Sequence, residues 1–162
     1  MGEYHVLEKG NHSKIMMIRN PIGTGESIGY LGGDFDEKTE RFFKPIIQHL
    51  DGGEDTANYL SSRGSLLAEI PYYMKGIDVQ DTYMIFDEAE DADLNIIKTV
   101  GTRVGENSAI VFSGDYNQSE GKFVVDNGLK KAVESLKGNP LVSIVVLDSD
   151  VRSESSRLFA EL

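Results

Sequence analysis

The stretch Thr82–Glu90 constrains the fold of this chain more than any other. Its apolar run ends abruptly in two adjacent acids, Asp87 and Glu88. Buried parallel strands read as continuous apolar runs, and ligands of open α/β sheets gather at the carboxyl ends of the strands. The stretch therefore predicts a buried strand that delivers two carboxylates to a sheet edge, where they suit Mg²⁺ and a polarised water. A strand followed by an acidic helix start is the alternative interpretation.

Apolar runs of strand character alternate with segments of helical periodicity along the rest of the sequence. This alternation predicts an α/β fold in three layers, with a parallel sheet covered by helices on both faces. The expected strands are residues 14–19, 82–87, 108–113 and 141–147, and the expected helices are the end of one in residues 1–10, then 34–50, 54–68, 92–104, 128–136 and 153–162.

Length and composition bound the class of protein. A chain of 162 residues with 40% hydrophobic content suits a single domain with its own core. The absence of cysteine excludes disulfides, cysteine-ligated zinc and thiol catalysis. The sequence has no apolar run of membrane-spanning length, and residues 1–9 lack the apolar core of a signal peptide. We therefore expect no membrane association and a cytoplasmic location.

The formal net charge of −11 argues against nucleic acid as an autonomous ligand. A nucleic-acid surface must neutralise phosphates, and an acidic free surface repels them. The basic residues are scattered, and only Lys130 and Lys131 are adjacent, so no basic patch is visible in the sequence. The net charge does not determine where the charges lie on the surface, so a local basic groove is an alternative that the sequence does not exclude.

Polar groups follow two further expected strands. Gly114, Asp115 and Gln118 come after the strand at 108–113, and Arg152 follows the strand at 141–147. Carboxylates for a metal, an amide for a water or phosphate and an arginine for developing charge form a phosphoryl-transfer set. Taken singly, each residue also has an ordinary interpretation as a strand end, a loop surface or a partner of nearby acids.

Several segments in series resemble motifs of the PhoH family, phosphate-starvation-inducible ATPases related to the core of superfamily-one helicases. The resemblance runs from about Lys9 to the end of the chain. The matching segments are Ile18-Arg19-Asn20-Pro21, Gly29-Tyr-Leu-Gly-Gly-Asp34, Phe43-Lys44-Pro45-Ile46, Met74-Lys75-Gly76, Asp87-Glu88-Ala89-Glu90-Asp91, Thr102-Arg103-Val104-Gly105, Ser113-Gly114-Asp115-Tyr116-Asn117-Gln118 and Asp148-Ser-Asp-Val-Arg152.

The resemblance implies a RecA-like P-loop nucleotide hydrolase core that uses ATP and Mg²⁺. By this resemblance Thr82–Glu90 is the Walker B strand, with Asp87 toward Mg²⁺ and Glu88 as the base that activates water. The implied roles of the remaining residues are a γ-phosphate sensor for Gln118, an arginine finger for Arg152 and cofactor binding for Arg19, Gly114 and Asp115. RNA is a further partner that the family leaves open.

The sequence departs from the family pattern at the phosphate-binding loop. The family's Walker A, a glycine-rich loop closing on Lys-Ser/Thr, does not occur in residues 1–162, and the loop from Gly23 to Gly33 does not match it. Glu90 also replaces the family's glutamine, and the histidine after Arg152 is missing. We therefore expect one PhoH-like domain, N-terminally incomplete and lacking the P-loop strand, with weak or no ATP turnover by itself. The alternative is a non-catalytic, degenerate RecA-like interaction module, with a second copy or another protein covering the open sheet edge.

Overall fold

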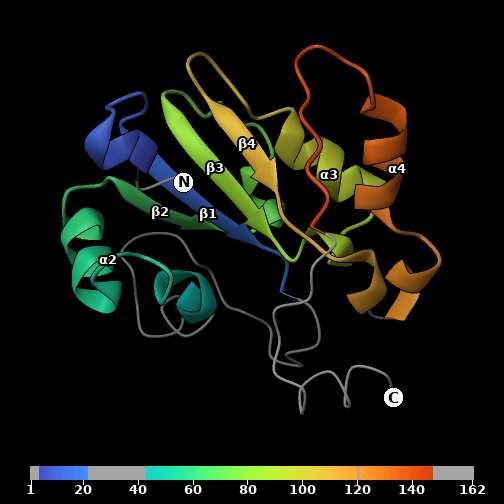
Figure 1. Ribbon diagram of the computed structural model, residues 1–162, viewed down its shortest axis with the longest axis horizontal. Helices are drawn as coiled ribbons and strands as arrows, with labels where there is room; N and C mark the ends of the chain where they lie inside the picture. The colour runs from blue at the N-terminus through green and yellow to red at the C-terminus, as the bar shows by residue number, and fades with distance from the viewer. Residues whose placement is uncertain (1–3, 22–42, 120, 148–162) are drawn as a thin grey trace.

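The computed structural model describes residues 4–21, 43–119 and 121–147 (Figure 1). Residues 43–47 form a helical segment between β1 and α2. The elements in chain order are η1 (Tyr4–Glu8), β1 (Lys14–Arg19), α2 (Gly53–Ser62), β2 (Leu66–Glu69), η2 (Pro71–Met74), β3 (Thr82–Asp87), η3 (Ala89–Asp91), α3 (Leu94–Gly101), β4 (Ala109–Phe112), η4 (Tyr116–Gln118), η5 (Gly121–Val124) and α4 (Gly128–Leu136).

The four strands form one parallel sheet in the order β2-β1-β3-β4, as Figure 1 shows. β1 and β3 pair along their full lengths, from Lys14 opposite Thr82 to Arg19 opposite Asp87. The chain moves to one side of β1 to form β2 and to the other side to form β3 and β4. This parallel α/β architecture confirms the fold predicted from the sequence.

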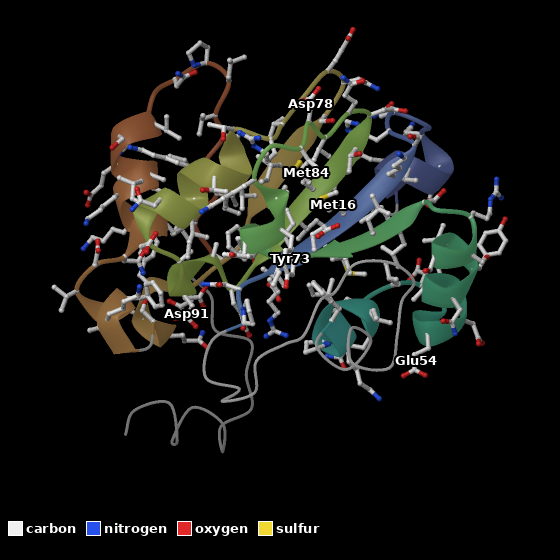
Figure 2. All side chains as sticks on the ribbon, turned by 180° about the vertical axis from the view of Figure 1, so that it is seen from behind. Met16, Glu54, Tyr73, Asp78, Met84 and Asp91 are labelled. Carbon is white, nitrogen blue, oxygen red and sulfur yellow. The ribbon has the colours of Figure 1, made fainter. Side chains whose placement is uncertain are left out.

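Side chains of the central strands divide between two hydrophobic clusters because successive residues of a strand point to opposite faces. Met16 and Ile18 pack on the face that α3, α4 and η2 cover, and Figure 2 labels Met16 beside Met84 on that face. Ile15 and Met17 pack on the other face, against residues 43–47 and α2. β1 carries four consecutive buried residues, as expected for a strand that is covered on both sides.

The region after α2 differs from its prediction. We expected one helix over residues 54–68, but α2 ends at Ser62, and Leu66 and Leu67 belong to β2. β2 pairs with β1, where Leu66 is almost fully buried. A run of four residues is too short to show a strand period, so tertiary pairing decides the structure of this segment.

The expected strand over residues 141–147 is not formed, although the segment is strongly apolar. Val142 to Leu147 lie outside regular secondary structure, and Leu141 and Leu147 are 93% and 89% exposed. β4 pairs only with β3 among the strands that the structure describes. Its second edge therefore carries no partner strand within the described residues, and Val111 on β4 is 40% exposed.

Several predictions concern residues outside the described ranges: the start of the helix predicted from residue 34, the segment from Asp148 to Arg152, and the helix predicted over 153–162. No helix within the described residues combines the length and the apolar character needed to cross a membrane.

Replacing Phe86 by alanine should destabilise the fold strongly. Phe86 is completely buried on β3, with its ring 5.8 Å from that of Phe112 between ring centres. Truncating such a side chain leaves a cavity and costs about 3–5 kcal/mol of unfolding free energy. Urea denaturation measures the loss.

The matched control is Tyr72→Ala, which removes another aromatic ring from a side chain that is 71% exposed. It should change the free energy of unfolding by no more than about 0.5 kcal/mol. Equal losses for the two variants would contradict the assignment of Phe86 to the core.

Candidate functional site

The site lies where the direction of the sheet connections reverses, between β1 and β3. In open parallel sheets this switch point leaves a crevice outside the carboxyl ends of the strands, because the two connections leave in opposite directions. β1 ends in Arg19 and β3 ends in Asp87, and the two residues are paired in the register. Their loops are also joined, because the Asn20 side-chain amide donates to the Asp91 carbonyl at 2.6 Å.

Arg19 and Glu88 form a forked ion pair across this switch point. Arg19 Nε donates to Glu88 Oε2 at 2.9 Å, and Arg19 Nη2 donates to Glu88 Oε1. The arginine side chain is only 12% exposed, whereas that of Glu88 is 47% exposed. Glu88 has a left-handed backbone conformation, with φ of 51°. The turn after β3 and the arginine fork together fix the direction of this carboxylate.

Asp87 is a half-buried carboxylate in the same cluster. Burial raises the pKa of Asp87 above its usual value, the nearby Arg19 charge opposes that rise, and the Glu88 charge adds to it. The cost of desolvating the charged form is thus only partly offset. A carboxylate in this state gains from a cation that binds beside it.

Glu90 follows the ion-paired Glu88 by two residues and is only 6% exposed. Its Oε2 has no hydrogen-bond partner, and its carboxylate packs against Gly114 so closely that a Cβ at position 114 would collide with it. Burial raises the pKa of Glu90, while the backbone N–H groups of Glu90 and Asp115 oppose the rise. Glu90 therefore links the loop after β3 to the loop after β4.

The residues after β4 form a separate polar group. Asp115 accepts hydrogen bonds from the Asn117 backbone N–H at 3.0 Å and from the Gln118 side-chain amide at 2.8 Å. Asp115 and Gln118 are exposed, and this pairing orients the Gln118 amide. Two backbone hydrogen bonds join this loop to β3, from Ser113 N–H to the Phe86 carbonyl and from Ala89 N–H to the Ser113 carbonyl, both at 2.9 Å.

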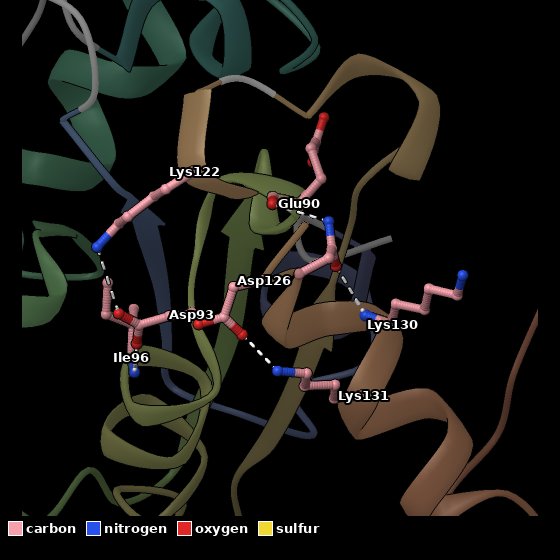
Figure 3. Close-up of polar contacts among 8 residues, drawn as sticks. Glu90, Asp93, Ile96, Lys122, Asp126, Lys130 and Lys131 are labelled. Carbon is pink, nitrogen blue, oxygen red and sulfur yellow. Dashed lines mark hydrogen bonds and ion pairs between the residues drawn. The ribbon is translucent and has the colours of Figure 1, made fainter. Parts of the chain in front are cut away.

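Asn127 is a buried residue of this region that the sequence did not single out. Its amide donates to the Glu90 carbonyl at 3.0 Å, and its Oδ1 caps α4 by accepting from Lys130 N–H (Figure 3). The same amide donates to Ser119 Oγ at 2.7 Å. An asparagine before a helix is recognisable as an N-cap, but its two long-range bonds have no sequence signal. Asp93 caps α3 in the same way and forms an ion pair with Lys122 at 3.6 Å (Figure 3).

The structure thus brings together Arg19, Asp87 and Glu88, and it places Gly114 against Glu90. Asp115 and Gln118 contact each other, and Arg152 lies outside the described residues. No group of three histidine, aspartate or glutamate side chains within the described ranges is arranged to hold a metal by itself. Asp87 would serve a metal as a single carboxylate ligand.

Comparison with known proteins gives one consistent result. The family model described as PhoH-like protein matches residues 3–161. The chain is 35% identical to Protein PhoH2 of Bacillus subtilis over 94% of its length, and 34% identical to the PhoH-like protein of the same organism over 89%. It is 30% identical to Protein PhoH2 of Mycolicibacterium smegmatis over 97% of its length. The chain covers 36%, 46% and 37% of these three relatives, which is less than half of each.

Glu90→Gln should stabilise the protein near neutral pH. The folded pKa of Glu90 is raised, so the folded state retains this proton where the unfolded state has lost it. The free energy of unfolding therefore falls as pH rises from the unfolded pKa through the folded pKa. The amide carries no charge, and we expect a gain of about 1 kcal/mol at about pH 7.5 that shrinks toward about pH 4.

Thermal or urea unfolding at several pH values measures this difference. Glu134→Gln is the control because it makes the same chemical change at an exposed position of α4. A variant whose stability follows the wild-type pH dependence throughout would show that Glu90 is not the group responsible.

Proposed function

The chain belongs to the PhoH-like family, and from this premise we propose that it is an ATP-binding domain whose chemistry is nucleotide hydrolysis. The observation that carries the proposal is the cluster of Arg19, Asp87 and Glu88 at the switch point of the sheet. Crevices at this position are the usual ligand sites of open parallel sheets. The cluster supplies both signs of charge that a magnesium nucleotide requires.

The donor set fits Mg²⁺. This ion is usually held by one or two carboxylates together with substrate phosphates and waters, and Asp87 is a half-buried carboxylate with incomplete charge compensation. A bound Mg²⁺ would neutralise phosphate charge. Asp87 would hold the cation, directly or through an ordered water, and the turn after β3 sets the position of Glu88 beside it.

We assign the remaining roles from the contacts of Arg19, Glu88 and Gln118 and, for Gly114, Asp115 and Arg152, from the family resemblance. Glu88 acts as general base toward a water, and Arg19 is a positioning residue that fixes its carboxylate. Gln118, oriented by Asp115, contacts the terminal phosphate, with Gly114 and Asp115 lining the nucleotide. Arg152 stabilises the charge that develops on phosphate during transfer.

We expect the 162-residue chain by itself to bind ATP weakly and to turn it over slowly. A glycine-rich loop contributes the backbone N–H groups and the lysine that contact most phosphate oxygens, and residues 1–162 contain no such loop closing on Lys-Ser/Thr. The carboxylates of Asp87 and Glu88 can serve the metal, but ionised carboxylates donate no hydrogen bonds to phosphate.

Calorimetric titration with ATP, with and without Mg²⁺, tests this function. We expect a Kd weaker than about 0.1 mM with Mg²⁺, and a further loss on removal of the metal. Asp87→Asn should abolish the difference between the two titrations because it removes the carboxylate that serves the metal. A Kd in the micromolar range would contradict the expectation of weak binding.

Asp55→Asn is the matched control, since Asp55 is an exposed acid on α2, away from the end of β3. Its two titrations should match those of the wild type. If Asp87→Asn also matched the wild type, Asp87 would not be the metal ligand.

A second candidate function is an interaction module, and we propose a second copy of this chain as the partner. The favouring observation is the second edge of β4, which pairs with no strand among the described residues, together with the exposed apolar segment 141–147. Unpaired strand edges and contiguous apolar surface both favour association. Pairing of two such edges would satisfy backbone groups and cover apolar side chains.

Light scattering over a range of concentrations tests this second candidate. The expected result is a reversible shift from the chain mass of 17.9 kDa toward twice that value. Val145→Lys with Val146→Lys should prevent the shift because both side chains are in the exposed segment. Val125→Lys, at another side chain that is 91% exposed, is the control and should leave association unchanged. A monomer at all concentrations would exclude the dimer.

A further inference from the structure

A pocket between η2 and α3 is lined by several basic side chains, although the chain as a whole is strongly acidic. Its volume is about 370 Å³, at the lower end of the range for small-molecule sites. Three of the side chains that line it are basic, on a chain whose formal net charge is −11. The lining residues are Lys75, Gly76, Asn95, Lys98, Thr99, Thr102 and Arg103.

Two segments that the proposed function does not use meet in this pocket. They are Met74-Lys75-Gly76, which follows η2, and Thr102-Arg103-Val104-Gly105, which follows α3. Arg103 Nη1 donates at 3.1 Å to the carbonyl of Ile77, the residue that follows Gly76, and this bond holds the two segments close together. The fold thus brings Lys75 and Arg103 to one concavity although they are far apart in sequence.

The charges in this pocket lack counterions within the described chain. No carboxylate among the described residues lies within ion-pair distance of Lys75, Lys98 or Arg103. The Nε atom of Arg103 is buried and makes no hydrogen bond, whereas its Nη2 donates to Thr102 Oγ1 at 3.2 Å. Nη1 and Nη2 each carry two N–H groups, so the guanidinium keeps further donors beyond its bonds to Ile77 and Thr102, and an anion in the pocket would compensate the positive charge.

One face of α3 and of the turn that follows it contributes polar side chains to the pocket. Asn95, Lys98, Thr99 and Thr102 recur at helical spacing and so share one face of the helix. On the other wall Lys75 lies over the ring of Tyr72, with its Nζ 5.8 Å from the ring centre. The side chains that line the pocket can therefore donate hydrogen bonds as well as supply positive charge.

The residues that line the pocket do not include Arg19, Asp87 or Glu88. Arg103 bonds to the segment just before β3, since its carbonyl accepts from Val79 N–H at 2.9 Å. That segment includes Asp78, and Figure 2 shows Asp78 well separated from Asp91, which follows Asp87 and Glu88 in the chain. The Arg103 end of the pocket is therefore separated from the carboxylate cluster.

We propose that this pocket binds a small anion through its phosphoryl groups, such as an inorganic oligophosphate. Lys75, which follows η2, and Lys98, on α3, supply positive charge. Arg103, which follows α3, supplies N–H donors in the fixed geometry of its guanidinium. Arginine and lysine together suit phosphoryl oxygens, which accept several charge-assisted hydrogen bonds at once. The site is independent of the nucleotide site proposed above.

Calorimetric titration of the 162-residue chain with inorganic pyrophosphate tests the proposal. EDTA is present throughout, so that metal binding at Asp87 plays no part. The double variant Lys75→Gln/Lys98→Gln should bind pyrophosphate roughly tenfold more weakly or worse. Both lysines are exposed, so the variant should fold normally. Lys130→Gln/Lys137→Gln removes the same charge from exposed positions elsewhere and should bind as the wild type does.

Further measurements separate this proposal from its competitors. Lys98 lies in the last turn of α3, where a cation also offsets the helix dipole. That role alone predicts a lower melting temperature for the Lys98 variant and unchanged affinity, which would overturn the proposal. Malonate binding as tightly as pyrophosphate would overturn the phosphoryl class. Tighter binding of a short single-stranded oligonucleotide at the same lysines would overturn the assignment to a small anion.

The Asp87→Asn variant keeps the two proposed sites distinguishable. It should lose the magnesium dependence of ATP binding and retain the wild-type affinity for pyrophosphate in EDTA. Asp87 repels an anion when no metal is present, so tighter pyrophosphate binding in this variant would show that the anion binds at the carboxyl end of β3. That result would overturn the assignment to this pocket.

Discussion

Everything else in this structure depends on the parallel pairing of β1 with β3. Their register is fixed along six residue pairs, and each strand presents alternate side chains to two different hydrophobic clusters. A slip of one residue would turn Met16 and Met84 away from the helices that cover them. The same register sets Arg19 opposite Asp87, so packing in the core determines the geometry of the charges at the end of the strands.

Two clusters of charged side chains that differ in the sign of their excess charge lie near the two ends of the sheet. At the carboxyl end, Asp87 and Glu88 share a single arginine, so negative charge exceeds positive charge there. At the opposite end, basic side chains gather around the C-terminal turn of α3 without acidic partners in the described chain. The fold separates these groups because α3 runs back along the sheet from the end of β3 to its beginning. One helix therefore connects an acidic edge with a basic concavity.

The sequence predicted the parts of the fold that local periodicity and buried strands encode. β1, β3, β4 and α4 lie where their patterns placed them, because each combines an apolar run or amphipathic face with a clear stop. β2 was missed because its four residues acquire strand structure only by pairing with β1. The segment 141–147 was wrongly predicted as a strand because it has the composition of a strand, but no strand of the described chain pairs with it. The composition of a segment sets its preference for strand structure, but a strand forms only where an adjacent strand is available to pair with it.

The candidate site was only partly predictable for the same reason. Asp87 and Glu88 follow an apolar run and stand out in the sequence, whereas the contact of Glu88 with Arg19 depends on two strands meeting. The basic pocket was not visible, because the sequence shows only scattered lysines and arginines. Lys75, Lys98 and Arg103 lie close together only because the fold packs η2 against α3.

The hydrogen bonds of Asn127 have a consequence for the way this region opens. The side-chain amide of Asn127 forms hydrogen bonds with the loop after β3, the loop after β4 and the first turn of α4. None of these segments can move far without breaking a bond at the same side chain. Backbone amides in all three should therefore exchange with solvent as one cooperative unit, at a common opening free energy, rather than as independent loops. The loops at the carboxyl end of the sheet should therefore open together as one cooperative unit.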